Sequence, residues 1–221
     1  MNTQLATVGP MLALSNAAVS ADQFSALSLS LCWAQAVARK TNQDVTSAAY
    51  SAVMFNELAR VGWTVAQSSS THVHRSGSSA NVAQMVPDIL ASFADPGTVD
   101  QVRRLFSGFS ATSAGPGLDS FMSTWWASQS TVLLSRAFVL CPAVLDPFGQ
   151  LSVSLVNYEF GVDASSWLSF FVTSQYQELD VDVTGVSMTL NFAIWSQISD
   201  AITQRLGAAS IASIGQLSLD L

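Results

Sequence analysis

The first half of the chain places its apolar residues at helical spacing. From Asp22, which can cap a helix, Phe24, Leu27 and Leu31 follow at steps of three and four residues. Residues at these steps lie on one face of an α-helix, where they can be buried together. The pattern therefore predicts a long first helix that begins near Asp22.

Three further segments show the same spacing and are predicted to be helices: 46–61, 82–90 and 99–106. Gly62 is expected to end the first of these, because glycine readily adopts the left-handed conformation that terminates helices. Pro87 lies inside the second and is expected to kink or restart it, since proline lacks the backbone N–H that a helix uses.

The second half of the chain changes to the two-residue alternation of β-strands. Residues 151–155 alternate leucine and valine with serine, and residues 179–190 alternate in a similar way. The alternation loses its phase at Gly185, which predicts a bulge or a hairpin turn there. Two strongly apolar segments, 137–140 and 168–173, are also predicted to be strands.

The chain closes with one more predicted helix, which Asn191 can cap and Gly207 can end. Helices first, strands second and a closing helix predict an α+β fold. Short turns between the strands, such as the one at 146–150, favour antiparallel pairing. We therefore expect an N-terminal helical half packed on a mainly antiparallel C-terminal sheet, closed by a C-terminal amphipathic helix.

Two segments show no regular period. Residues 1–20 are small and polar with scattered alanine and leucine, and they are expected to be a loosely ordered leader. Residues 67–80 are rich in serine and are expected to form a polar loop. The best candidate boundary, 110–117, is not expected to separate independent domains. Residues 21–221 are therefore expected to form a single α+β domain.

Charge is scarce in this sequence. Charged residues make up 10% of the chain and the net charge is −7, whereas typical soluble domains are about 25% charged. Arg39-Lys40 and Arg103-Arg104 are the only adjacent basic pairs. Binding to nucleic acid or to anionic lipid requires a basic patch, so neither is expected. Such a surface either tolerates contact with apolar partners or suits crowded or assembled surroundings, and both interpretations stay open.

The sequence shows no export signal or membrane-spanning segment. The first twenty residues contain no lysine or arginine, whereas a secretory signal begins with basic residues. No run of eighteen apolar residues occurs, so no helix is expected to span a bilayer. We expect synthesis in the cytoplasm without a Sec signal. Release by a non-Sec route and peripheral attachment to a membrane are both compatible with this.

Common catalytic and nucleotide-binding motifs are absent from the sequence, including GxSxG, GxGxxG, HExxH, CxxC and Walker A. The two histidines, His72 and His74, both fall in the expected polar loop. Their spacing could hold a metal ion, but no third ligand is evident, and a solvent-exposed segment is the favoured interpretation. No catalytic residue, metal site or resident cofactor is therefore predicted, and a non-enzymatic role is favoured.

Several other side chains have both a structural and a functional interpretation. Asp180 and Asp182 alternate along a strand, and a solvated sheet face is favoured for them. Aromatic residues such as Trp195 could form a wall around a ligand, although core packing is the more common role. Cys32 and Cys141 are interpreted from their apolar surroundings as buried, inert cysteines.

Short motifs follow one another in a set order along residues 22–207. They are Val61-Gly62-Trp63-Thr64 before a serine-rich segment, the helices at 82–90 and 99–106, Ser169-Phe170-Phe171-Val172-Thr173-Ser174, Thr189-Leu190-Asn191-Phe192, and Ile194-Trp195 followed by Arg205-Leu206-Gly207. This order resembles the Erwinia virulence factor (Evf) family. The resemblance implies a soluble α/β virulence protein that carries a palmitoyl group in thioester linkage.

In that family the acylated cysteine lies about eighty residues before the C-terminus, and Cys141 lies eighty residues before Leu221. The resemblance therefore implies that Cys141 is the acyl attachment point. A bound or covalent fatty acid would take the place of a cofactor. The residues expected to form the hydrophobic pocket around the acyl chain are Phe138, Leu140, Phe170, Phe171 and Trp195.

A second resemblance concerns the strand-rich part of the chain. Segments 125–130, 151–160 and 167–174 resemble the strand region of Cyt-type and volvatoxin pore-forming toxins. This resemblance implies strands that insert into membranes with their apolar faces toward lipid.

The favoured function is that of a non-enzymatic, virulence-factor-like protein that binds or covalently carries a fatty-acyl chain and acts at membranes. Two alternatives stay open: a Cyt-like pore-forming toxin, and a structural or cargo protein of a larger assembly. The expected partner is a fatty-acyl lipid or a membrane rather than nucleic acid, and assembly into a homo-oligomer stays open.

Overall fold

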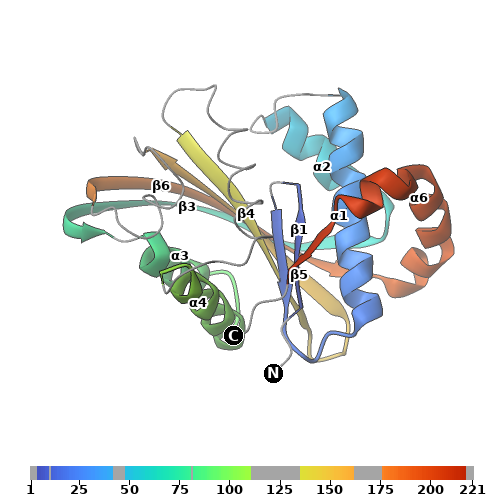
Figure 1. The fold of residues 1–221 in the computed structure, drawn as a ribbon, viewed down its shortest axis with the longest axis horizontal. Coiled ribbons are helices and arrows are strands. Elements are labelled where there is room, and N and C mark those ends of the chain that lie inside the picture. The colour runs from blue at the N-terminus through green and yellow to red at the C-terminus, as the bar shows by residue number, and fades with distance from the viewer. Residues whose placement is uncertain are drawn as a thin grey trace.

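One sheet of seven strands runs through the described part of the protein (Figure 1). The structure, a computed structural model, describes residues 4–9, 11–41, 48–80, 82–110, 135–161 and 176–217. The strands lie in the order β3-β6-β5-β4-β2-β1-β7. Their bounds are Gln4–Val8 for β1, Met11–Ser15 for β2, Trp63–Ala80 for β3, Ser135–Leu145 for β4, Leu151–Gly161 for β5, Tyr176–Leu190 for β6 and Gly215–Leu217 for β7.

Helices cover parts of both faces of the sheet (Figure 1). The described helices are α1 (Ala21–Thr41), α2 (Ala48–Arg60), α3 (Val82–Leu90), α4 (Pro96–Ser110) and α6 (Phe192–Ala212). The apolar side chains under α3 and α4 are called here the α3/α4 core, and those under α1, α2 and α6 the α1/α2/α6 core. Among the described strand pairs, only β2 and β4 are parallel. The predicted α+β fold is therefore confirmed.

Polar side chains at the helix ends set several of the boundaries. At the start of α1, the Ser20 hydroxyl accepts from the Gln23 N–H, and the Gln23 side chain accepts from the Ser20 N–H. This reciprocal capping box begins the helix slightly before the predicted cap, Asp22. Gly62 follows α2 at a φ of 101°, as its predicted terminator. Asn191 caps α6, since its side-chain oxygen accepts from the first-turn N–H groups.

Neither of two residues predicted to interrupt or end a helix does so completely. α3 extends across Pro87, and the Ala91 N–H bonds the Pro87 carbonyl at 3.1 Å. Gly207 has a φ of 72° and interrupts the helical geometry of α6, but the helix resumes as far as Ala212. Gly207 therefore kinks the closing helix rather than ending it.

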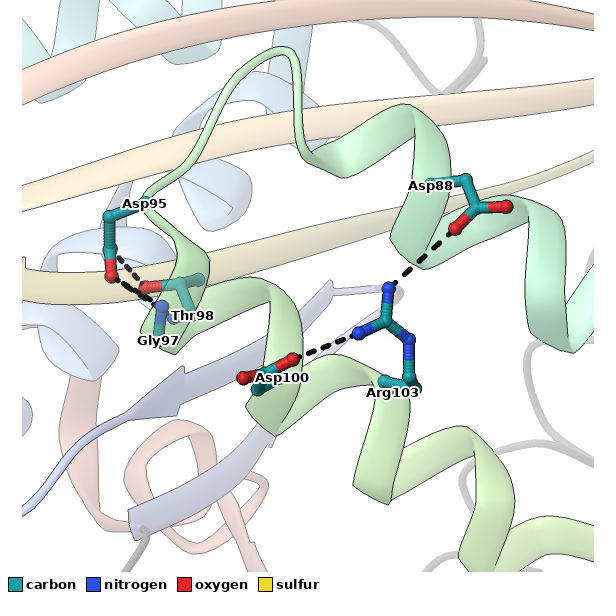
Figure 2. Close-up of polar contacts among 6 residues, drawn as sticks. All are labelled: Asp88, Asp95, Gly97, Thr98, Asp100 and Arg103. Atoms are coloured by element: carbon teal, nitrogen blue, oxygen red, sulfur yellow. Dashed lines mark hydrogen bonds and ion pairs between the residues drawn. The ribbon is translucent and has the colours of Figure 1, made fainter.

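Polar contacts link α3 to α4 (Figure 2). Asp95 caps α4, because its Oδ1 accepts from two backbone N–H groups of the first turn at 2.9 and 3.1 Å. Arg103 donates to Asp100 at 2.9 Å within α4 and lies 3.6 Å from the Asp88 carboxylate of α3. Exposed ion pairs of this kind contribute at most about 1 kcal/mol. The apolar faces of these helices therefore supply most of their attachment to the sheet.

Residues 4–15, expected to belong to a loose leader, instead form β1 and β2 inside the sheet. The two strands pair with each other, and β2 also pairs in parallel with β4. Both strands are short and nearly every residue in them is buried. Strands covered on both faces show no alternation of apolar and polar residues. Their sequence therefore lacks the period on which strand prediction depends.

Residues 67–80, expected to be a loop, instead belong to β3. This strand pairs with β6 along most of its length. It is the terminal strand of the sheet, and residues 64–72 are exposed on both of its faces. A strand that buries neither face needs no apolar residues, so serine and threonine are compatible with it. The loop prediction failed because an uncovered edge strand has a loop-like composition.

Gly185 does not produce the predicted bulge or turn. β6 is continuous, and its register with β5 runs without a shift from Asp180 opposite Gly161 to Thr189 opposite Ser152. The phase of the sequence changes because the covered face changes. Within β6, Val181 and Val183 belong to the α3/α4 core. Met188 and Leu190, seven residues further on, belong to the α1/α2/α6 core.

The same exchange of faces occurs in the two neighbouring strands. In β5, Leu155 is the last residue of the α1/α2/α6 core and Val156 the first of the α3/α4 core. In β4, the exchange lies between Leu140 and Cys141. The register places Leu140 opposite Val156 and Val156 opposite Gly185. One line across the sheet therefore separates the two cores.

Gly185 lies on this line against the ring of Phe93. A Cβ added at Gly185 would overlap the Phe93 ring. We expect Gly185→Ala to lower the free energy of unfolding by about 1–3 kcal/mol, because overpacking forces neighbouring groups to shift. Urea denaturation of the variant and of the matched control Thr184→Ala, at an exposed position of the same strand, would measure this effect.

The cause can be tested in a Phe93→Ala background. Removing the ring should remove most of the cost of Gly185→Ala, which a double-mutant cycle detects. An equal cost in both backgrounds would show that the Phe93 contact is not responsible.

Candidate functional site

Cys141 lies in β4 at the line where the two cores meet. Its side chain is fully buried in the α1/α2/α6 core, and its strand partner in β2 is Ala13. Burial raises the pKa of the Cys141 thiol far above its ordinary value. Because the thiolate is the nucleophilic form, this thiol is shielded both from reagents and from deprotonation. Any chemistry at Cys141 therefore requires the helical layer to be open.

The predicted pocket residues do not share one face of the sheet. Phe138 and Leu140 belong to the α3/α4 core, whereas Trp195 and Cys141 belong to the α1/α2/α6 core. Phe170 and Phe171 lie outside the described residues. The sheet thus separates two of the expected wall residues from the expected attachment point. Of the described wall residues, only Trp195 lies in the same core as Cys141.

Phe138 instead belongs to an aromatic group under α3 and α4. Its ring stacks on Tyr158 with centroids 5.1 Å apart and on Phe160 with centroids 5.8 Å apart, and Phe106 of α4 lies at 6.2 Å. The Tyr158 hydroxyl donates to the Val86 carbonyl at 3.2 Å. These rings fill the space between sheet and helices, which is the packing role that aromatic residues most often have.

Cys32 is buried in α1, as predicted. Its sulfur contacts the Ser210 carbonyl of α6 at 3.6 Å. Burial raises the pKa of this thiol, and the positive charge of Arg39 partly opposes the increase. Its exposed fraction is 9%, whereas that of Cys141 is 0%. The two cysteines are therefore both shielded, Cys141 more completely.

The histidines lie on the exposed face of the β3–β6 pair. His72 Nδ1 is 2.7 Å from Asp182 Oδ1, and both side chains are more than half exposed. His74 stands opposite Asp180 in the register. The solvated face predicted for Asp182 is confirmed. No group of three His, Cys, Asp or Glu side chains within the described residues could hold a metal ion.

Exposed large apolar side chains gather at one end of the sheet. Phe148 is 87% exposed in the β4–β5 turn, and Ile194 and Phe192 are 44% and 42% exposed in the first turn of α6. Val65, near the start of β3, is 51% exposed. These four residues are called here the apolar end. They are the exposed large apolar side chains within the part of the chain that the structure describes.

The β4–β5 turn holds Phe148 in a defined position. Asp146 Oδ1 accepts from the backbone N–H of Phe148 at 2.9 Å and from that of Gln150 at 2.8 Å. Gly149 completes the turn at a φ of 76°, which glycine adopts without a steric cost. The turn is therefore closed by its own polar groups, and the phenylalanine ring has no part in closing it.

Strand pairing brings the other apolar-end residues to the same end of the sheet. Ser152, just after the turn, stands opposite Thr189 near the end of β6. α6 follows at once, and the Asn191 N–H bonds the Gly62 carbonyl at 2.9 Å. Gly62 leads into β3 and so to Val65. Sequence reasoning missed this site, although the phenylalanine between Pro147 and Gly149 in a turn was its signal.

No helix within the described ranges is long and apolar enough to cross a membrane.

Comparison with known proteins supplies a likeness of fold. No family model matches the chain, and no curated protein matches it. A solved delta-endotoxin aligns over 83% of this chain and 84% of its own, with a TM-score of 0.51 and 12% identity. The chain shares the delta-endotoxin fold. At this identity the likeness concerns the fold alone.

A second solved structure is titled "Structure of the Evf virulence factor". It aligns over 91% of this chain and 76% of its own, with 12% identity and a TM-score of 0.41. A score this low does not establish a shared fold. No family is assigned to this chain.

The burial of the two cysteines predicts a distinct pattern of chemical labelling. In the native protein, iodoacetamide should modify Cys32 slowly and Cys141 more slowly still, because Cys141 is fully covered and its thiol pKa is strongly raised. In urea both should react at the rate of an exposed thiol. Peptide mass spectrometry after timed quenching measures this. Native labelling of Cys141 at the unfolded rate would show that the α1/α2/α6 layer does not cover it.

Proposed function

We propose that this protein is a toxin-like protein that acts at membranes and meets the lipid surface with its apolar end. The observation that carries the proposal is the exposure of Phe148, Phe192, Ile194 and Val65 together at one end of the sheet. Exposed apolar side chains gathered at one end of a protein mark a surface for apolar partners. The delta-endotoxin fold and the low charge of the chain support a lipid surface as that partner.

The size of the apolar end sets the strength of binding. Transfer of a fully exposed phenylalanine into an apolar phase gains about 1.5–3 kcal/mol. Phe148 would gain most of this, and the half-exposed residues would each gain a smaller part. A total of about 4–6 kcal/mol corresponds to a dissociation constant on the order of millimolar to 0.1 mM. The apolar end alone therefore supports reversible attachment at the membrane surface.

The charges near the apolar end favour zwitterionic lipid. Asp146 lies in the turn that carries Phe148. Arg60, at the end of α2, is paired with Glu57 at 2.7 Å. Neither group offers an unpaired positive charge that anionic headgroups would attract. Vesicles of phosphatidylcholine are therefore the expected target.

The exchange of covered faces argues for surface action over insertion of the central strands. A strand that crosses a bilayer needs about 9–11 residues with one continuous apolar face. In β5 the face that carries Leu151, Val153 and Leu155 continues with Asn157 and Glu159. Insertion of β5 with this face toward lipid would place the Glu159 carboxylate in the apolar layer, and insertion with its other face toward lipid would place Ser152 and Ser154 there. A pore-forming role would therefore require β5 to be rebuilt as well as uncovered.

Substitution of Phe148 tests this function. We expect Phe148→Ser to lower partition onto phosphatidylcholine vesicles about tenfold or more, because the largest apolar contact is lost. Phe148→Leu should retain most of the binding. Thr71→Ala, an exposed change on β3 far from the apolar end, is the matched control. Co-flotation with vesicles measures the bound fraction.

Equal flotation of all three variants and the native protein would contradict a role for Phe148. Dye release measured on the same vesicles separates the alternatives. Binding without release fits surface action, whereas release with SDS-stable oligomers would favour the pore-forming toxin.

A second candidate function is the carriage of a fatty-acyl chain on Cys141. The apolar surroundings of this thiol favour it, because an acyl chain attached there would be kept from water in the α1/α2/α6 core. Each buried methylene of such a chain contributes about 0.8 kcal/mol. The thiol is fully covered in the folded protein. Acylation would therefore take place before the helical layer closes over β4.

Intact-mass spectrometry tests the acyl candidate. We expect a palmitate-sized adduct that hydroxylamine removes, because hydroxylamine cleaves thioesters. Cys141→Ser should lack the adduct, and Cys32→Ser should keep it. Protein of unmodified mass in every preparation would eliminate acyl carriage and leave the apolar-end proposal untouched.

A further inference from the structure

The outer edge of β3 pairs with no other strand of the described residues. β3 is the terminal strand of the sheet and is 18 residues long (Figure 1). Its inner edge pairs with β6 in an unbroken register from Gln67 opposite Ser187 to Ser76 opposite Glu178. Shifts of register lie at both ends of this stretch. Residues 67–76 therefore form a straight ladder whose outer edge pairs with no described strand.

Devices that protect edge strands are scarce in this ladder. Natural sheets protect their edges with lysine, proline, inward charges or very short strands. The opposite edge of this sheet, β7, is three residues long. By contrast, residues 67–76 contain no lysine, aspartate, glutamate or proline, and their one arginine, Arg75, lies next to the end of the ladder. Residues 67–72 are exposed throughout, so neither face of the strand hinders an approaching partner.

We propose that the outer edge of residues 67–76 pairs with the same segment of a second copy of this chain. Antiparallel pairing of one segment with itself has twofold symmetry, so both copies present the same surface. The resulting sheet would continue through two molecules. Backbone N–H and C=O groups of β3 would supply the contacts, and the side chains would stay in water.

The charges around the edge suit a second copy. Residues 67–74 contain no lysine, arginine, aspartate or glutamate, and antiparallel pairing places the Arg75 of each copy at opposite ends of the ladder, so the two edges do not repel each other. The nearest described carboxylate, that of Asp182, lies one strand further in and is in contact with His72. A strand with acidic side chains would meet this carboxylate and that of Glu159, which stands opposite Asp182. An uncharged strand such as residues 67–74 avoids this repulsion.

Polar edge pairing buries little apolar surface, so the affinity between the two copies should be low. Sedimentation equilibrium of the full chain should show a monomer at low concentration and a dimer at high concentration. Ser70→Lys places a charge in the middle of the edge and should weaken dimerisation on the order of tenfold or more. Thr203→Lys, an equal change at an exposed position of α6, should leave it unchanged.

A distance measurement identifies the surface used. A spin label on Thr71→Cys should give one short distance between copies, below about 25 Å, because the twofold axis passes close to this residue. The same label on Thr203→Cys should give a longer distance. The two native cysteines are buried, which directs the label to the introduced thiol.

Each result decides the proposal. A chain that stays monomeric at all concentrations overturns it. A dimer that Ser70→Lys leaves intact, or in which the Thr71 labels lie far apart, also overturns it, because the copies then meet through another surface. Neither measurement contains lipid, so the outcome is independent of membrane binding.

Discussion

The fold of this protein depends on a change in which face of the sheet is buried. The change occurs along one line that crosses the central strands. β4, β5 and β6 each bury one face on one side of the line and the opposite face on the other. Along β4, β5 and β6 the two sets of helices therefore cover different stretches of the strands, on opposite faces, whereas β1 and β2 are buried on both faces (Figure 1). In the half of β5 and β6 that α3 and α4 cover, the other face carries the exposed Asp182 and Glu159.

The proposed functions follow from what these helices leave uncovered. Where α1, α2 and α6 cover the sheet, Cys141 is dry and inert. Beyond the ends of the covered strands, the turn that carries Phe148 is free to meet lipid. At the far edge, Trp63 and Val73 of β3 pack against the two cores, but residues 64–72 are exposed on both faces. The Cys141 thiol is therefore buried, while the Phe148 ring and the backbone edge of β3 are exposed.

Elements with a strong period could be predicted from the sequence, and elements without one could not. The helices and the alternating strands followed from spacing, because each buries one face against a single layer. β1 and β2 were missed because both faces are buried, and β3 because neither is. The change of phase at Gly185 is visible in the sequence, but it does not mark a bulge or a turn. Only the unshifted pairing with β5 shows that the buried face of the strand changes there.

The candidate site was predicted less well than the fold. Phe138 and Cys141 are three residues apart in sequence, and the sheet lies between them. A two-residue period places residues three apart on opposite faces. The expected wall therefore mixed residues from both cores. The apolar end was missed because its members come from segments far apart in the chain, which only strand register brings together.

The line between the cores also divides the protein into two units of stability. Val183 and Met188 belong to one strand. Val183 becomes exposed only when α3 and α4 detach from the sheet, and Met188 only when α1, α2 and α6 detach. Opening of α3 and α4 would leave Cys141 protected, and opening of α1, α2 and α6 would leave the Phe138 stack intact. Native-state hydrogen exchange would then show two levels of protection within β6, one on each side of Gly185.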